Sequence, residues 1–136
     1  MKYVLDACSL IAYFNDEEGS LTVKSILAEA VSGDTTVLIH RVNLFEVYYD
    51  LLRSGGEIMA RTAMAFLYDS PVEIINIITD EIMEEAARFK LSYKISVADS
   101  FALAISKLEG ATLITADHHE FNAIDEANEL PILWFR

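Results

Sequence analysis

Two kinds of hydrophobic pattern alternate along this chain. Five short runs of apolar, mostly β-branched residues are typical of strands that are buried on both faces. These runs are Tyr3–Leu5, Val37–Ile39, Ile74–Ile77, Thr112–Ile114 and Ile132–Trp134. Between them, five longer segments carry apolar residues at intervals of three and four, as amphipathic helices do. These segments are Ser20–Val31, Asn43–Arg53, Glu57–Tyr68, Asp80–Leu91 and Val97–Leu108.

The alternation of strands and helices predicts an α/β fold. A mostly parallel central sheet covered by helices on both faces gives a three-layer α/β/α domain. Glycines stand at the expected boundaries: Gly33 ends one helix, Gly55 and Gly56 separate two others, and Gly110 precedes the fourth strand. The 136 residues suit one hydrophobic core, and no linker or repeat interrupts them. We therefore expect a single domain over residues 1–136.

Composition and charge narrow the function classes. Apolar residues make up 53% of the chain and charged residues 24%, which provides material for a core and argues against disorder. The net charge of −12 argues against broad electrostatic binding to nucleic acid or to an anionic membrane surface. A single cysteine, Cys8, excludes an internal disulfide and a cysteine-based zinc cage.

The sequence gives no sign of targeting to a membrane or of export. No stretch approaches the roughly 18 apolar residues that a membrane-spanning helix needs. The first residues reach Asp6 without a basic leader followed by an apolar run, so we expect a cytoplasmic protein.

Two aspartates follow directly after predicted strands. Asp6 comes after Tyr3–Leu5 and precedes an apolar stretch, and Asp117 comes just after the strand that contains Thr112–Ile114. In open parallel sheets, ligands bind beyond the carboxyl ends of the strands. Each aspartate also fits a simpler role as a helix cap or turn residue. A buried, unpaired charge costs several kcal/mol or more, so Asp6 must meet a cation, a metal or a set of donors.

Two further acids lie on predicted helices. Asp99 stands three residues after Ser96, which fits a capping box, but the helix behind it is apolar nearly all round. Its first turn therefore faces a cleft rather than bulk water, and the two roles can coexist. A helical wheel places Glu46 on a polar stripe with Asn43, Asp50 and Arg53, which favours a solvated face.

Four acids from separate segments, Asp6, Glu46, Asp99 and Asp117, could converge on one site. An all-oxygen ligand set selects hard cations such as Mg²⁺ or Mn²⁺. Such a site suits phosphodiester hydrolysis, in which the metal polarises phosphoryl oxygens and lowers the pKa of a bound water.

Other chemistries fit less well. His118 and His119 are adjacent and lack the helical spacing of a zinc site, and His40 fits a surface or hydrogen-bonded histidine better than a ligand. Cys8 in an apolar run fits a small buried hydrophobe better than a nucleophile. Phosphate-cradling glycine motifs are absent.

The basic residues Arg88, Lys90 and Lys94 could contact a few phosphates, although a solvated helix end explains them as well. The apolar residues Met59, Met64, Phe66, Tyr48 and Tyr49 fit the core better than a partner groove.

Four segments occur in order along nearly the whole chain: Val4–Ala12, Asn43–Val47, Ser96–Ala102 and Thr115–Phe121. Together they resemble the motifs of PIN-domain nucleases and, more narrowly, of VapC-type toxins from prokaryotic toxin–antitoxin pairs. The resemblance implies a PIN-like fold and a metal-dependent endoribonuclease that hydrolyses RNA with Mg²⁺ or Mn²⁺. It also implies a quartet that is both catalytic and metal-binding, consisting of Asp6, Glu46, Asp99 and Asp117. Only the resemblance favours Glu46 over a solvated face.

The resemblance has implications for the surroundings of the quartet and for partners. Ser9 and Thr115 match small hydroxyl positions beside the family's acids, where they would donate supporting hydrogen bonds. Cys8 stands where the pattern often has Ser or Asn, so a contact there is lost. The implied partners are an antitoxin that sends a basic residue into the acidic cleft and a second copy of the toxin. The alternative is a non-catalytic PIN-like module that binds a protein, which the presence of all four acids disfavours.

Overall fold

The computed structural model describes residues 1–136 and contains one five-stranded sheet. All strand pairs are parallel, and the strand order is β3-β2-β1-β4-β5. The strands are β1 (Lys2–Leu5), β2 (Thr36–His40), β3 (Glu73–Ile75), β4 (Thr112–Thr115) and β5 (Ile132–Trp134). The sheet predicted from the apolar runs is thus confirmed.

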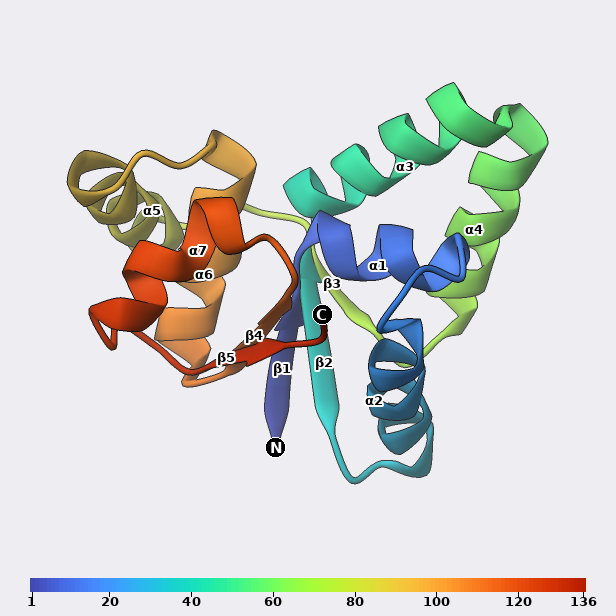
Figure 1. The fold of residues 1–136 in the computed structure, drawn as a ribbon, viewed down its shortest axis with the longest axis horizontal. Coiled ribbons are helices and arrows are strands. Elements are labelled where there is room, and N and C mark those ends of the chain that lie inside the picture. Colours follow the sequence, from blue (N-terminus) through green and yellow to red (C-terminus); the bar gives the residue numbers. More distant parts are fainter.

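Seven helices cover the sheet. They are α1 (Ala7–Phe14), α2 (Ser20–Ser32), α3 (Arg41–Gly55), α4 (Glu57–Asp69), α5 (Asp80–Ser92), α6 (Val97–Glu109) and α7 (His118–Glu126). Helices α1 to α4 lie on one side of the sheet and α5 to α7 on the other (Figure 1). The predicted three-layer α/β/α architecture is confirmed. None of these helices has the length and apolarity needed to cross a bilayer.

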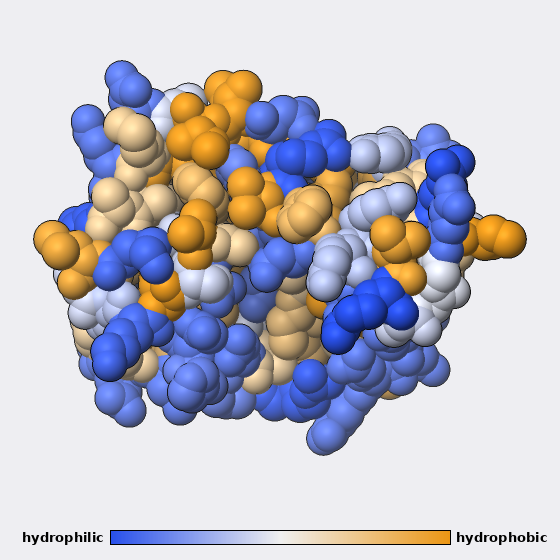
Figure 2. Space-filling view, turned by 90° about the horizontal axis from the view of Figure 1, so that it is seen from above, coloured by the Kyte–Doolittle hydropathy of each residue, from blue (hydrophilic) through white to orange (hydrophobic).

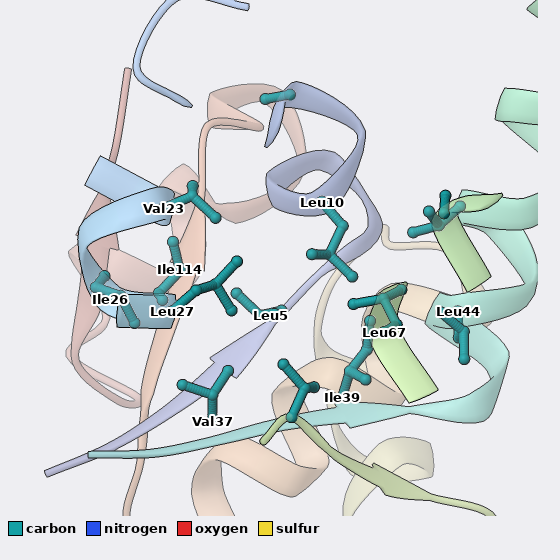
Figure 3. Close-up of a cluster of buried hydrophobic side chains, with 14 of the residues drawn as sticks. Leu5, Leu10, Val23, Ile26, Leu27, Val37, Ile39, Leu44, Leu67 and Ile114 are labelled. Carbon is teal, nitrogen blue, oxygen red and sulfur yellow. The ribbon is translucent and has the colours of Figure 1, made fainter. Parts of the chain in front are cut away.

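Alternation along the strands divides the core into two layers. Leu5, Val37, Ile39 and Ile114 point to the side of α1 to α4, and Figure 3 shows them packed among Leu10 and other side chains from those helices. The neighbouring residues Val4, Leu38 and Leu113 point to the side of α5 to α7. Successive side chains of a strand face opposite ways, so a strand covered on both faces needs apolar residues at every position.

The strand order fixes where a ligand site can form. The chain moves outward from β1 through β2 to β3, then returns to pair β4 with the other edge of β1. The direction of winding reverses between β1 and β4, which opens a crevice beyond their carboxyl ends. Asp6 follows β1 directly and Asp117 lies two residues beyond β4. The topology therefore brings both aspartates to the same end of the sheet.

Two details differ from the sequence pattern. Strand β3 ends at Ile75, before Asn76 and Ile77. The Asn76 side chain accepts from Arg41, and the Ile77 carbonyl lies 3.0 Å from His40 Nε2. Helices α1 and α7 do not stand out in the apolar pattern because each is short, and each begins behind an aspartate cap.

Candidate active site

Asp6 lies at the carboxyl end of β1, and both of its carboxylate oxygens accept hydrogen bonds. Its side chain is 2% exposed. Asp6 Oδ1 accepts a hydrogen bond from the Ser9 backbone N–H at 2.8 Å, which caps α1, and Oδ2 accepts one from Thr115 Oγ1 at 2.5 Å. The Ser9 hydroxyl donates to the Asp6 carbonyl oxygen at 2.8 Å rather than to the carboxylate. Asp6 is thus both a helix cap and a buried acid, and the Thr115 hydroxyl donates a hydrogen bond to it.

Asp99 lies in the first turn of α6 and faces Asp6. The Ser96 hydroxyl caps this helix by accepting from the Asp99 backbone N–H at 3.1 Å. Burial is the largest cause that raises the pKa of Asp99 to about 7, and the negative charges of Asp6, Glu120 and Glu46 contribute to this increase. Asp99 therefore lies in the capped first turn of α6 and is partly buried.

Asp6 has a raised pKa for a similar reason. Burial raises its pKa to about 6, against the lowering effect of the hydrogen bonds from Thr115 and Ser9. The charge of Asp117 contributes a smaller increase. Buried carboxylates whose pKa values are raised by burial and by neighbouring negative charges are characteristic of functional sites, including sites that hold a cation.

Asp117 and Glu120 come from the start of α7. The Asp117 backbone N–H donates to Thr115 Oγ1 at 3.0 Å, and its Oδ1 caps the helix by accepting from the Glu120 backbone N–H at 3.1 Å. Thr115 therefore links Asp6 to Asp117. Glu120 is an acid that sequence reasoning missed, and its charge acts directly on Asp99. Its position three residues after a cap is the one signal that could have drawn attention to it.

Glu46 is not on a freely solvated face. The side chain is half-buried, and burial raises its pKa. The polar stripe drawn from the helical wheel is wrong at Asn43, which is fully buried and donates from Nδ2 to the Ala98 carbonyl oxygen at 3.0 Å. This bond joins α3 to α6 one residue before Asp99. Asp50 lies four residues after Glu46 and forms an ion pair with Arg53, with 2.7 Å between Oδ1 and the guanidinium nitrogen. This ion pair offsets the repulsion between Asp50 and Glu46.

The carboxylate and amide oxygens of this region are ligand types that suit a hard divalent cation, although they do not converge on one point in the structure. No three His, Cys, Asp or Glu side chains are placed closely enough to hold an ion. Two side-chain oxygens in this region, Glu120 Oε2 and Asn43 Oδ1, are buried and have no hydrogen-bond partner. A buried acceptor without a donor is costly, and a carboxylate oxygen in that position is best satisfied by a cation. The chemistry of these oxygens thus matches Mg²⁺ or Mn²⁺.

The residues of the competing chemistries have other contacts. The His118 ring stacks on Trp134 with 4.1 Å between the ring centroids, and its Nε2 lies 2.9 Å from the Arg136 carbonyl oxygen. Burial raises the pKa of the Cys8 thiol to about 11, which removes it as a nucleophile. His40 is buried, accepts from the Val42 N–H and caps α3, so it is a hydrogen-bonded structural histidine.

No free basic cluster lies before Asp99 either. Arg88 pairs with Glu85 and Glu129, and the Lys90 ammonium donates to the Ile95 carbonyl at 2.7 Å. Arg88 and Lys90 are therefore already engaged within the protein and do not form a free cluster that attracts phosphates.

Comparisons with known proteins agree with this geometry. The family model described as PIN domain matches residues 3–127. No curated protein matches this sequence. Among solved structures, VapBC2 from Rickettsia felis bound to a promoter DNA fragment has a TM-score of 0.75 at 18% identity, covering 98% of each chain. A toxin–antitoxin complex from Klebsiella pneumoniae has a TM-score of 0.72 at 22% identity, again covering 98% of each chain.

A third similar structure is VapC20 from Mycobacterium tuberculosis, described as a toxin that cleaves the sarcin-ricin loop. It has a TM-score of 0.71 at 20% identity and covers 89% of this chain and 94% of its own. At these identities the solved structures establish a shared fold, while the family model covers most of the chain. The chain therefore belongs to the PIN domain family, a family of nucleases.

Proposed function

We propose that this protein is a Mg²⁺- or Mn²⁺-dependent endoribonuclease that hydrolyses RNA phosphodiester bonds. The proposed catalytic and metal-binding residues are Asp6, Glu46, Asp99 and Asp117, with Glu120 added from the structure. The observation that carries the proposal is the buried Asp6 at the switch point of the sheet, whose negative charge raises the pKa of Asp99. A bound divalent ion would polarise the phosphoryl oxygens and lower the pKa of a water.

The chain's own residues supply orientation and proton transfer. Thr115 and the Ser9 N–H fix both oxygens of Asp6, so this carboxylate offers a preset ligand position. The Asn43 bond to Ala98 fixes the start of α6, which carries Asp99, against α3, which carries Glu46. Glu46 is half-buried, and burial raises its pKa, which suits it to accept a proton from the attacking water.

We further propose that the protein is the toxin of a VapBC-type pair, with an antitoxin as its partner. The sequence motifs support this, as do the toxin–antitoxin complexes that share its fold. A net charge of −12 suits a partner that carries basic residues. We also propose that the toxin forms a homodimer and acts in the cytoplasm, as expected from the sequence.

An apolar groove on the surface could bind such a partner. It has a volume of about 580 Å³ and is lined by Tyr13, Phe14, Leu21, Met59 and Phe66 from α1, α2 and α4. A second hollow of about 360 Å³ shares Tyr13 and Phe66 with it, which extends the groove along α2. Met64 instead belongs to the core, so only part of the apolar pair of helices is exposed. Exposed apolar grooves of this kind are common at protein interfaces.

The test is cleavage of a panel of structured RNAs by the purified protein, with Mn²⁺ or with chelator. We expect metal-dependent cuts that disappear in Asp99→Asn, while Glu84→Gln on the exposed face of α5 still cuts. Cuts that persist in chelator or in Asp99→Asn would refute the assigned site. A folded protein that cuts nothing and binds no Mn²⁺ would favour the alternative of a non-catalytic protein-binding module.

A further inference from the structure

An exposed aromatic surface lies beside Glu46. Phe45 and Tyr49 on α3 are 63% and 56% exposed. Their ring centroids are 6.4 Å apart and their planes are inclined by only 25°. Figure 2 looks down on the carboxyl ends of the strands and shows apolar side chains exposed among hydrophilic ones at this end of the molecule. Large exposed rings in near-parallel planes form a surface on which another planar group can stack.

This aromatic surface is continuous with the candidate active site. Phe45 and Tyr49 line an open cavity of about 340 Å³ together with Glu46, Ala7 and Ile11. Ala7 directly follows Asp6 in the chain. A molecule that occupies the cavity therefore contacts Glu46 and lies next to the backbone that carries Asp6.

The charge distribution indicates how this surface can bind. Six of the ten Lys and Arg residues already pair with acids, so little positive charge is free to attract phosphates. Arg53, the one cation that lines the cavity, is tied to Asp50, and its guanidinium lies 6.0 Å from the centroid of the Tyr49 ring. Aromatic side chains with an adjacent arginine are the combination that binds single-stranded RNA through its bases.

We infer that Phe45 and Tyr49 stack the base of a nucleotide that flanks the scissile phosphate of single-stranded RNA. This inference rests on the proposed ribonuclease function and adds a base-binding subsite to it. Stacking needs no free cation and accepts any base, so it supplies affinity that an acidic protein cannot obtain from phosphate contacts. The subsite sets substrate affinity, while the acids set the rate of the chemical step.

The test measures kcat and KM on a short RNA whose cleaved bond has been mapped. Two matched RNAs carry an abasic ribose on the 5′ or the 3′ side of that bond. We compare the wild-type protein with Phe45→Ala and Tyr49→Ala, and use Tyr68→Ala, an exposed tyrosine of α4 outside the cavity, as the control. Melting temperatures and solution masses of all four proteins are recorded, since loss of an exposed ring leaves the fold intact.

On intact RNA, Phe45→Ala and Tyr49→Ala should each raise KM by roughly tenfold with little change in kcat, and Tyr68→Ala should change neither. On one of the two abasic RNAs, the wild-type KM should already be raised and the two variants should add no further loss.

Three results would overturn the subsite. The first is an unchanged KM of both variants on intact RNA. The second is an equal rise in the KM of the variants on intact RNA and on both abasic RNAs. The third is a halved solution mass of the variants, which would assign the surface to a second copy of the chain. Wild-type protein that cleaves no RNA refutes the proposed function and the subsite with it, whereas normal cleavage with unchanged KM in both variants refutes the subsite alone.

Discussion

Thr115 Oγ1 donates a hydrogen bond to Asp6 Oδ2 at 2.5 Å and, through the same oxygen, accepts one from the Asp117 N–H at 3.0 Å. One hydroxyl at the end of β4 therefore orients the acid that follows β1 and the cap of α7. All three groups lie at the switch point of the sheet. Hydrogen bonds from fixed donors hold a carboxylate in place and lower its pKa, which opposes the effect of burial.

Thr115→Val should destabilise the protein. Valine keeps the shape of the side chain but removes the hydroxyl, so a buried carboxylate oxygen loses its donor. Such a loss costs about 1 to 3 kcal/mol. Urea unfolding at pH 8 measures it, with the exposed Thr62→Val as the control. Equal stabilities of the wild type and Thr115→Val would show that this hydrogen bond does not hold Asp6.

Asp99→Asn should stabilise the metal-free protein at high pH. The folded-state pKa of Asp99 is raised from 3.8 to about 7, so its protonated form favours folding. That stability is fully present below about pH 4 and is lost as the pH rises towards 7. The asparagine has no charge to bury, so its advantage over the wild type should grow by about 1 to 3 kcal/mol between pH 5 and pH 8.

Urea unfolding in chelator at several pH values measures that difference. Glu84→Gln, which neutralises an exposed acid on α5, should follow the wild type across the range. An advantage of Asp99→Asn that stays constant with pH would mean that Asp99 is not electrostatically strained in the folded protein.

Glu120→Gln should lower the pKa of Asp99. Removing the Glu120 charge takes away one of the negative charges that raise this pKa. Carbon-13 NMR titration of the Asp99 carboxyl group measures the shift in the metal-free protein. Glu126→Gln at the far end of α7 serves as the control. If both variants leave the Asp99 titration where it is, Glu120 is not part of the acidic site.

Asn43→Ala should weaken both stability and metal binding. The change removes the bond from the buried Asn43 side chain to the Ala98 carbonyl and frees the start of α6 from α3. We expect a loss of about 1 to 3 kcal/mol in unfolding free energy. We also expect a weaker Mn²⁺ affinity, because Glu46 and Asp99 lose their fixed spacing. The exposed Asn122→Ala is the matched control, and a Mn²⁺ affinity equal to that of the wild type would exclude the positioning role.

The strands, and the places of Asp6 and Asp117 beyond the ends of two of them, could be predicted from the sequence because their signals are local. Buried parallel strands must be apolar on both faces, and Asp6 and Asp117 stand directly at their ends. Glu46 could not be placed this way. The helical wheel put Asn43 on the solvated stripe, but the Ala98 carbonyl from a distant helix buries it, and periodicity within one helix does not report such a contact. Glu120 was missed because an acid in the first turn of a helix has an ordinary local explanation.

The central claim is that these acids form one divalent-cation site, and direct measurement of Mn²⁺ binding tests it most simply. Calorimetric titration or electron paramagnetic resonance of Mn²⁺ with the wild-type protein, Asp6→Asn, Asp99→Asn and the Glu84→Gln control gives the affinity without any substrate. The account predicts saturable binding by the wild type and Glu84→Gln, and a loss of at least tenfold in affinity in both aspartate variants. Equal Mn²⁺ binding by all four proteins would contradict it.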